Sequence, residues 1–140
     1  MARCAGLSGL VAVLMVVAGC SSEPKLAQMS GKVTFKGQPV PAGYISFTPD
    51  FGQKGEVRVV QIKDGAYDSS KEQTPGVFPG SCTVRIAGYN GNPEKLFPQG
   101  KQIFNTYEFK ETVADGTVTK DFTVPESYGK NVKIEPTADE

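Results

Sequence analysis

Residues 31–47 read GKVTFKGQPVPAGYISF, and this stretch decides the fold class. Polar and apolar residues alternate over 32–35, which is typical of a β-strand with one buried face. The run stops at 36–39, where a glycine and a proline favour a turn, and alternation returns over 44–48. The stretch therefore predicts two short strands with a tight connection between them.

The rest of the chain continues this pattern of short strands and turns. It contains 16 glycines and 10 prolines, and no long stretch combines helical periodicity with good helix formers. Further strands are predicted at 56–63, at 66–67, from Pro79-Gly80 to Ile86, at 103–109, at 117–124 and at 132–134. The apolar phase shifts between Val59 and Val60, which predicts a bulge or burial on both faces there. About seven short strands indicate an all-β fold, a β-sandwich.

We expect one domain over residues 29–136, followed by a disordered tail at 137–140. This length suits one domain and leaves no room for two. The predicted core consists of apolar residues that alternate with polar ones, namely Val33, Phe35, Ile45, Phe47, Val84, Ile86, Phe122 and Val124. Cys82 shares the face of Val84 and Ile86, so we expect a small buried hydrophobe rather than a reactive thiol.

The N-terminal segment predicts export. Arg3 is the one charge among the first 19 residues, and residues 5–18 form an apolar run that is too short to span a bilayer. The run ends in Val17-Ala18-Gly19-Cys20, which resembles the lipobox of bacterial lipoproteins. In that motif small side chains flank the scissile bond and the thiol of the cysteine takes a diacylglycerol. The alternative is a plain secretory signal or a marginal membrane anchor.

The lipobox resemblance predicts the address of the protein. Residues 1–19 would be a cleaved signal peptide, and residues 20–28 a lipidated cysteine with a short polar tether. No acidic retention signal follows Cys20, which favours the outer membrane, with the domain on the periplasmic or cell-surface face. Cys4 leaves with the signal and Cys20 is acylated, so Cys82 remains and no intramolecular disulfide is available.

Several turn and strand motifs occur in a familiar order. They are Gly31-Lys32-Val33, Gly37-Gln38-Pro39-Val40, Ile45-Ser46-Phe47, Asp64-Gly65-Ala66-Tyr67 and Pro79-Gly80-Ser81 followed by Cys82 to Ile86. This order resembles that of carboxypeptidase-regulatory-like domains, although Cys82 stands where those domains often have an aromatic residue. The resemblance implies a seven-stranded, transthyretin-like Greek-key sandwich. With the lipobox, the whole chain is similar to small bacterial lipoproteins that carry one such domain, and this implies no reaction.

Composition excludes several kinds of chemistry. The chain has no histidine, which removes Ser-His-Asp catalysis and every histidine-based zinc site. Loss of Arg3 with the signal leaves 14 of 15 basic side chains against 15 acidic ones, so no basic face for nucleic acid is expected. The aspartates show no EF-hand spacing, so no metal is expected. We therefore expect a protein that is not an enzyme and has no cofactor besides the lipid on Cys20.

Two other hypotheses involve Lys32 and the segment 88–101. Related adhesin sandwiches form a Lys–Asn isopeptide bond, and Lys32 and Asn131 are suitably placed in the chain, but alternation turns Lys32 to solvent. The long loop 88–101 is the candidate ligand or partner site, because it combines aromatic, apolar and amide groups in Tyr89, Asn90, Asn92, Leu96 and Phe97. Alternatively, Leu96 and Phe97 pack back onto the rim of the sandwich.

Two functions follow from these observations. The first is a membrane-anchored envelope lipoprotein that displays a non-catalytic β-sandwich as a structural or protein-interaction module. The alternative is a module that binds a small ligand, a carbohydrate or envelope glycan, through the loop 88–101. An uncovered edge strand or an apolar patch would favour the first function, whereas an exposed aromatic platform would favour the second. The sequence names neither the partner nor the ligand.

Overall fold

Nine strands and two short 3-10 helices form residues 24–132, the part of the chain that the computed structural model describes. The elements are β1 (Gln28–Phe35), β2 (Gln38–Pro39), β3 (Ala42–Pro49), β4 (Arg58–Lys63), β5 (Ala66–Asp68), η1 (Ser69–Lys71), β6 (Gly80–Tyr89), β7 (Tyr107–Val113), β8 (Thr117–Thr119), β9 (Phe122–Val124) and η2 (Glu126–Gly129). The all-β prediction is confirmed. Within the described part, no helix is long and apolar enough to cross a membrane.

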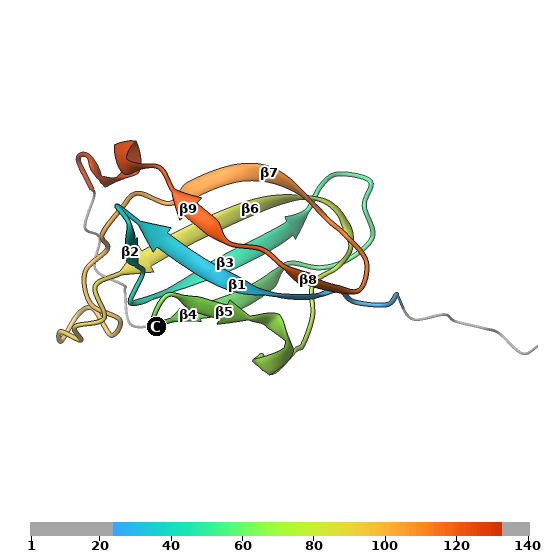
Figure 1. Cartoon of the computed structure of the whole chain (residues 1–140), viewed down its shortest axis with the longest axis horizontal. Helices are drawn as coiled ribbons and strands as arrows, with labels where there is room; N and C mark the ends of the chain where they lie inside the picture. The colour runs from blue at the N-terminus through green and yellow to red at the C-terminus, as the bar shows by residue number, and fades with distance from the viewer. Residues whose placement is uncertain (1–23, 133–140) are drawn as a thin grey trace, which may run out of the picture.

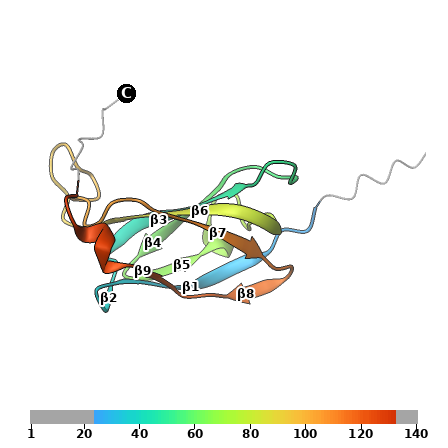
Figure 2. The ribbon, with the colours of Figure 1, turned by 90° about the horizontal axis from the view of Figure 1, so that it is seen from above.

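The strands form one curled sheet in the order β2-β1-β5-β4-β3-β6-β7. Its ladders are antiparallel, except that β8 and β9 add to β1 in parallel. Figures 1 and 2 show the result: β3, β4, β6 and β7 lie on one side of the core, β1, β8 and β9 lie on the other, and β5 joins them. Phe109 on β7 and Phe122 on β9 meet across the interior, with ring centroids 5.6 Å apart.

Two tight turns were predictable from their residues. The β1–β2 turn has positive φ at Lys36 and Gly37, and the β4–β5 turn has positive φ at Asp64 and Gly65. Positive φ at both central residues is the requirement of the hairpin turn whose twist matches that of the flanking strands. The Gly signals therefore mark the chain reversals correctly.

All eight residues of the predicted core are buried, and so is Cys82 at 2% exposure. They pack with further buried residues that complete the core, which are Ala27, Met29, Val40, Val60, Ile62, Tyr67, Val77, Phe104 and Val113. Lys32 is exposed, as its alternation predicts. The core thus lies between the two sides of the curled sheet.

Several predicted boundaries and one predicted irregularity are wrong. The strand expected at 103–109 begins only at Tyr107, and the strand expected at 117–124 is two strands, β8 and β9. No bulge interrupts β4, since Ser46 pairs with Val59 and Ile45 with Val60 in continuous register. Val59 is 51% exposed, so the phase shift reflects an apolar residue on the outer face.

The ordered domain begins two residues earlier than predicted. Ala27 is fully buried and exchanges two backbone hydrogen bonds of 2.8 Å with Val77, and Gln28 is already part of β1. The tether that was expected to reach residue 28 therefore ends before Ala27. The predicted signal peptide, lipobox and Cys20 lie outside the described residues, as do the tail 137–140 and, apart from Val132, the strand expected at 132–134.

Candidate functional site

One edge of β4 is only half covered. Toward β3 all six residues of β4 are paired, but toward β5 only Ile62 and Lys63 are paired. The reason is that β5 ends after three residues, where Asp68 caps η1 by accepting a hydrogen bond from the backbone N–H of Ser70. Within residues 24–132, no strand pairs with this side of residues 58–61.

The helix η1 is held away from β4 by contacts with β1. Ser69 is fully buried, and its Oγ accepts a hydrogen bond of 2.8 Å from the backbone N–H of Met29. Hydrogen bonds from Ser70, together with the nearby Lys71, hold the pKa of Asp68 below its ordinary value, so the capping carboxylate is ionised at neutral pH. These contacts fix the point at which the chain leaves the edge of β4.

The open edge carries hydrogen-bonding groups of the backbone. The N–H of Gln61 points away from β3 and donates to Oε1 of Glu72 at 2.8 Å. Because strand residues alternate in the direction of their backbone groups, the N–H and C=O of Val59 point to the same side as those of Gln61. A side-chain carboxylate thus occupies one backbone donor that a neighbouring strand would otherwise use.

Apolar side chains flank this edge on the outer face. Val57 and Val59 are 54% and 51% exposed. Arg58 turns the other way, and its guanidinium lies 4.9 Å from the ring centroid of Phe78. A groove of about 410 Å³ runs beside the edge, lined by Val57, Arg58, Val59, Gln61, Glu72, Gln73 and Thr74. Both a strand edge and an opposite wall therefore bound the groove.

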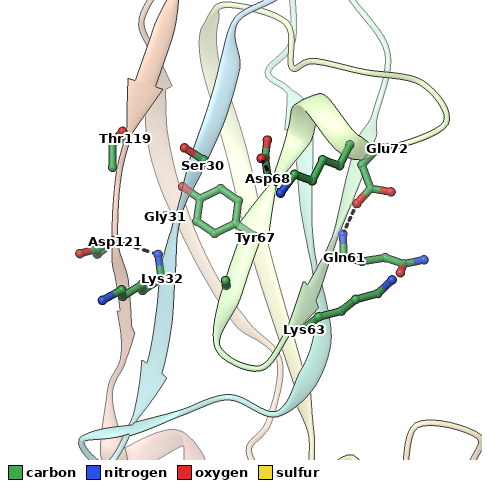
Figure 3. Close-up of a pocket in the computed structure, with 12 residues that line it drawn as sticks. Ser30, Gly31, Lys32, Gln61, Lys63, Tyr67, Asp68, Glu72, Thr119 and Asp121 are labelled. Carbon is green, nitrogen blue, oxygen red and sulfur yellow. Dashed lines mark hydrogen bonds and ion pairs between the residues drawn. The ribbon is translucent and has the colours of Figure 1, made fainter.

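A second groove, of about 660 Å³, adjoins the first and shares Gln61 and Glu72 with it. Figure 3 shows side chains of β1, β4, β5 and β8 around it. It is lined by Ser30, Gly31, Lys32, Gln61, Lys63, Ala66, Tyr67, Asp68, Lys71, Glu72, Thr119 and Asp121.

The acidic and basic side chains of the second groove differ in the contacts that they already make. Its three carboxylates all accept hydrogen bonds: Asp68 from Ser70, Glu72 from Gln61, and Asp121 from the backbone N–H of Lys32. By contrast, the ammonium groups of Lys32 and Lys63 form no ion pair with any described residue. Lys32 and Lys63 therefore have no ion-pair partner within residues 24–132, although the groove holds as many carboxylates as ammonium groups.

In the candidate loop 88–101, one of the polar side chains forms hydrogen bonds within the loop itself. Oδ1 of Asn90 accepts hydrogen bonds from the backbone N–H groups of Asn92 and Lys101, at 3.0 and 3.2 Å. Leu96 is 52% exposed and Phe97 is half-buried, so these side chains do not form a buried pair on the rim. Asn90 thus closes the base of the loop, while Asn92 is exposed.

Tyr89, the last residue of β6, pairs with Tyr44, which the sequence did not single out. Their ring centroids are 6.3 Å apart and the rings are tilted by 37°. Burial, with Tyr44 nearby, raises the pKa of Tyr89 to about 12. Two half-buried, tilted rings do not make the flat platform that would favour carbohydrate binding.

Two residues of the open edge, Val57 and Val59, were missed as functional candidates. The available signal was the phase shift at Val59 and Val60, which indicates an apolar side chain on the polar face of a strand.

Among residues 24–132, no group of three or more metal-ligating side chains is present. Burial raises the pKa of Cys82 to about 11, which leaves the thiol protonated at neutral pH.

Comparison with known proteins adds one distant likeness. No family model matches the chain, and no curated protein matches it. A crystal structure of a DUF3823 family protein from Parabacteroides merdae ATCC 43184 matches at 14% sequence identity with a TM-score of 0.41. The match covers 81% of this chain and 48% of the Parabacteroides protein. This chain thus spans about half the length of that protein.

Proposed function

We propose that the chain is an exported, lipid-anchored envelope protein whose non-catalytic β-domain binds an extended segment of a partner protein along residues 58–61 of β4. The observation that carries the proposal is the half-open edge of β4, with Val57 and Val59 exposed beside it. Extended peptides add to such edges as an extra strand, using main-chain hydrogen bonds for affinity and alternate side chains for specificity.

The groove suits one added strand rather than another sheet. The incoming segment would continue the line of β5 past Asp68, between β4 and the wall formed by residues 72–74. A second sheet would bring further strands into that wall. Apolar residues at alternate positions of the segment would contact Val57 and Val59, and an acidic residue at its end would reach Lys63.

In this proposal, Glu72 occupies the binding edge of β4 until the partner displaces it. Its carboxylate accepts the N–H of Gln61 in the free protein, and a backbone carbonyl of the partner would replace it. One hydrogen bond replaces another, and the carboxylate returns to water, so the exchange costs little. The same carboxylate protects the edge from unspecific pairing in the absence of the partner.

The anchor and the finer fold type belong to the same proposal. The lipobox motif supports acylation of Cys20 in a bacterial membrane, with the outer membrane favoured. A Greek-key sandwich of the transthyretin-like, carboxypeptidase-regulatory-like type is supported by the two facing sides of the sheet (Figure 2) and by the positions of its turns at Gly37 and Gly65. The partner would be another envelope protein.

Site-specific photo-crosslinking in the native envelope tests the edge. With the photoreactive residue at Val57 of the full-length protein, we expect one discrete adduct, and none with the residue at Thr117 on β8, which is also exposed. Val59→Pro removes an edge donor and should reduce the adduct about tenfold, while the isosteric Val59→Thr should not.

Two outcomes would contradict the proposed edge. Equal adducts in the Val59→Pro and Val59→Thr proteins would show that the backbone edge is not used. An adduct with twice the mass of the chain would identify a second copy, not a partner protein.

A further inference from the structure

The connection between β3 and β4 carries an unusually exposed aromatic side chain near its start. Phe51 has a relative exposure of 108%, so the whole ring is in contact with solvent. An apolar ring with no protein cover is unfavourable in water. Elsewhere in the described chain, phenylalanine rings such as Phe47 and Phe104 are fully buried.

The residues around Phe51 are firmly held. The carboxylate of Asp50 accepts hydrogen bonds from Ser81 Oγ at 2.6 Å, Thr83 Oγ1 at 3.0 Å and Lys110 Nζ at 2.6 Å. The backbone N–H of Asp50 donates to the carbonyl of Ser81, and Gln53 closes a turn onto the carbonyl of Asp50. Phe51 is therefore presented on a braced turn.

This turn lies at the end of the domain where the chain enters. Figures 1 and 2 both place the connection between β3 and β4 at the same end as the start of β1. The contacts agree, since Ala27 pairs with Val77, three residues before the strand β6 that holds Asp50. Six residues lie between Cys20 and Ala27, and a fully extended chain over that span reaches about 25 Å at most.

We propose that Phe51 inserts into the interfacial region of the membrane to which Cys20 is anchored, as a second contact that orients the domain. This inference rests on the lipid anchor of the proposed function. Lys25 and Lys54 near the same end are exposed and form no ion pair with a described residue, so they suit lipid phosphates. Lys110 neutralises Asp50, the carboxylate next to Phe51.

The absence of tryptophan from the chain gives a direct test. The full-length lipidated protein carrying Phe51→Trp is placed in phosphatidylethanolamine–phosphatidylglycerol vesicles whose acyl chains are brominated. The matched control is Leu96→Trp, at a 52% exposed position in the connection between β6 and β7 at the opposite end of the domain (Figure 1). We expect a shift to shorter wavelength and loss of emission by bromine quenching at residue 51, with neither change at residue 96.

The outcomes separate this inference from the anchor. Acylated protein in which residues 51 and 96 are quenched equally, or not at all, would overturn the role of Phe51 and leave the anchor in place. A wavelength shift at residue 51 that grows with protein concentration, without quenching, would assign the ring to a contact between copies and overturn it too. A Cys20 without acyl mass would overturn the proposed anchor, and this inference with it.

Discussion

Gly31 marks the closest approach between β1 and the segment that joins β8 to β9. A Cβ at this position would lie 2.0 Å from the carbonyl oxygen of Lys120. That carbonyl accepts a hydrogen bond of 2.6 Å from Oη of Tyr67, and the N–H of Lys120 donates to Ser30, so the peptide is held from both sides. The Lys120 peptide, held by Tyr67 and Ser30, therefore cannot move away from an added Cβ without loss of these hydrogen bonds.

Gly31→Ala should therefore lower the free energy of unfolding by about 2–3 kcal/mol, the upper part of the usual range for overpacking. Urea unfolding followed by circular dichroism measures it. Ser30→Ala, one residue earlier on β1, is the control and should cost less than about 1 kcal/mol. Equal stability of the Gly31→Ala and Ser30→Ala proteins would refute the close approach.

Asp50 illustrates what alternation cannot reveal. The sequence offered it only as one of several aspartates without calcium spacing. In the fold it joins Ser81 and Thr83 on β6 with Lys110 on β7, and the hydrogen bond from Lys110, helped by those from the hydroxyls, lowers its pKa from 3.8 to about 2. Its partners are 31 to 60 residues away in the chain, so they become neighbours only through long-range pairing.

This pKa shift gives a pH dependence with a defined sign. Because the folded pKa lies below the unfolded one, the ionised carboxylate stabilises the fold above pH 3.8, and this contribution is lost as the pH falls toward 2. Asp50→Asn should lower the thermal midpoint at pH 6, and the difference from wild type should shrink between pH 4 and pH 2. A constant difference across that window would show that the charge is not responsible.

At the scale of the element, β4 is a regular strand with one half-open edge. Its turn at Asp64 and Gly65 and its buried residues Val60 and Ile62 were predictable from local signals. The open half was not, because it depends on where β5 stops, and that is decided by the burial of Ser69 against β1. The exposed Val59 was visible in the sequence, but without the pairing it had no structural interpretation.

The two hydrogen-bonding edges of β4 should respond differently to substitution by proline. The N–H of Val59 faces the open edge, so Val59→Pro should change the free energy of unfolding by less than about 1 kcal/mol. The N–H of the buried Val60 faces β3, so Val60→Pro should cost about 3 kcal/mol or more. Native-state hydrogen exchange adds a check, with fast exchange at Val59 and slow exchange at Val60. Slow exchange at both would mean that the edge is covered.

At the scale of the whole molecule, the all-β class and the core were predictable, while the closure of the sheet was not. Alternation and glycine turns mark each strand locally, which is why all eight predicted core residues are buried. The parallel addition of β8 and β9 to β1 joins segments about 90 residues apart, as between Val33 and Phe122. No local pattern encodes that register, and the division of 117–124 into two strands follows from it.

The anchor and the fold should be separable. Residues 24–26, the described residues before Ala27, are not part of the hydrophobic core, so Cys20→Ser should abolish lipidation without changing the thermal midpoint of the domain. The variant should leave the detergent phase, because each buried CH₂ of the missing acyl chains contributes about 0.8 kcal/mol to membrane binding. A lower midpoint for Cys20→Ser would show that the N-terminal segment belongs to the fold.

Mass spectrometry of the N-terminal peptide of the native protein tests the central claim, that this β-domain is held at a membrane by its first mature residue. The prediction is a peptide that begins at Cys20 and carries the mass of a diacylglycerol, with or without a further acyl chain on its amino group. A free, unmodified N-terminus at any other position, or an unmodified Cys20, would contradict it.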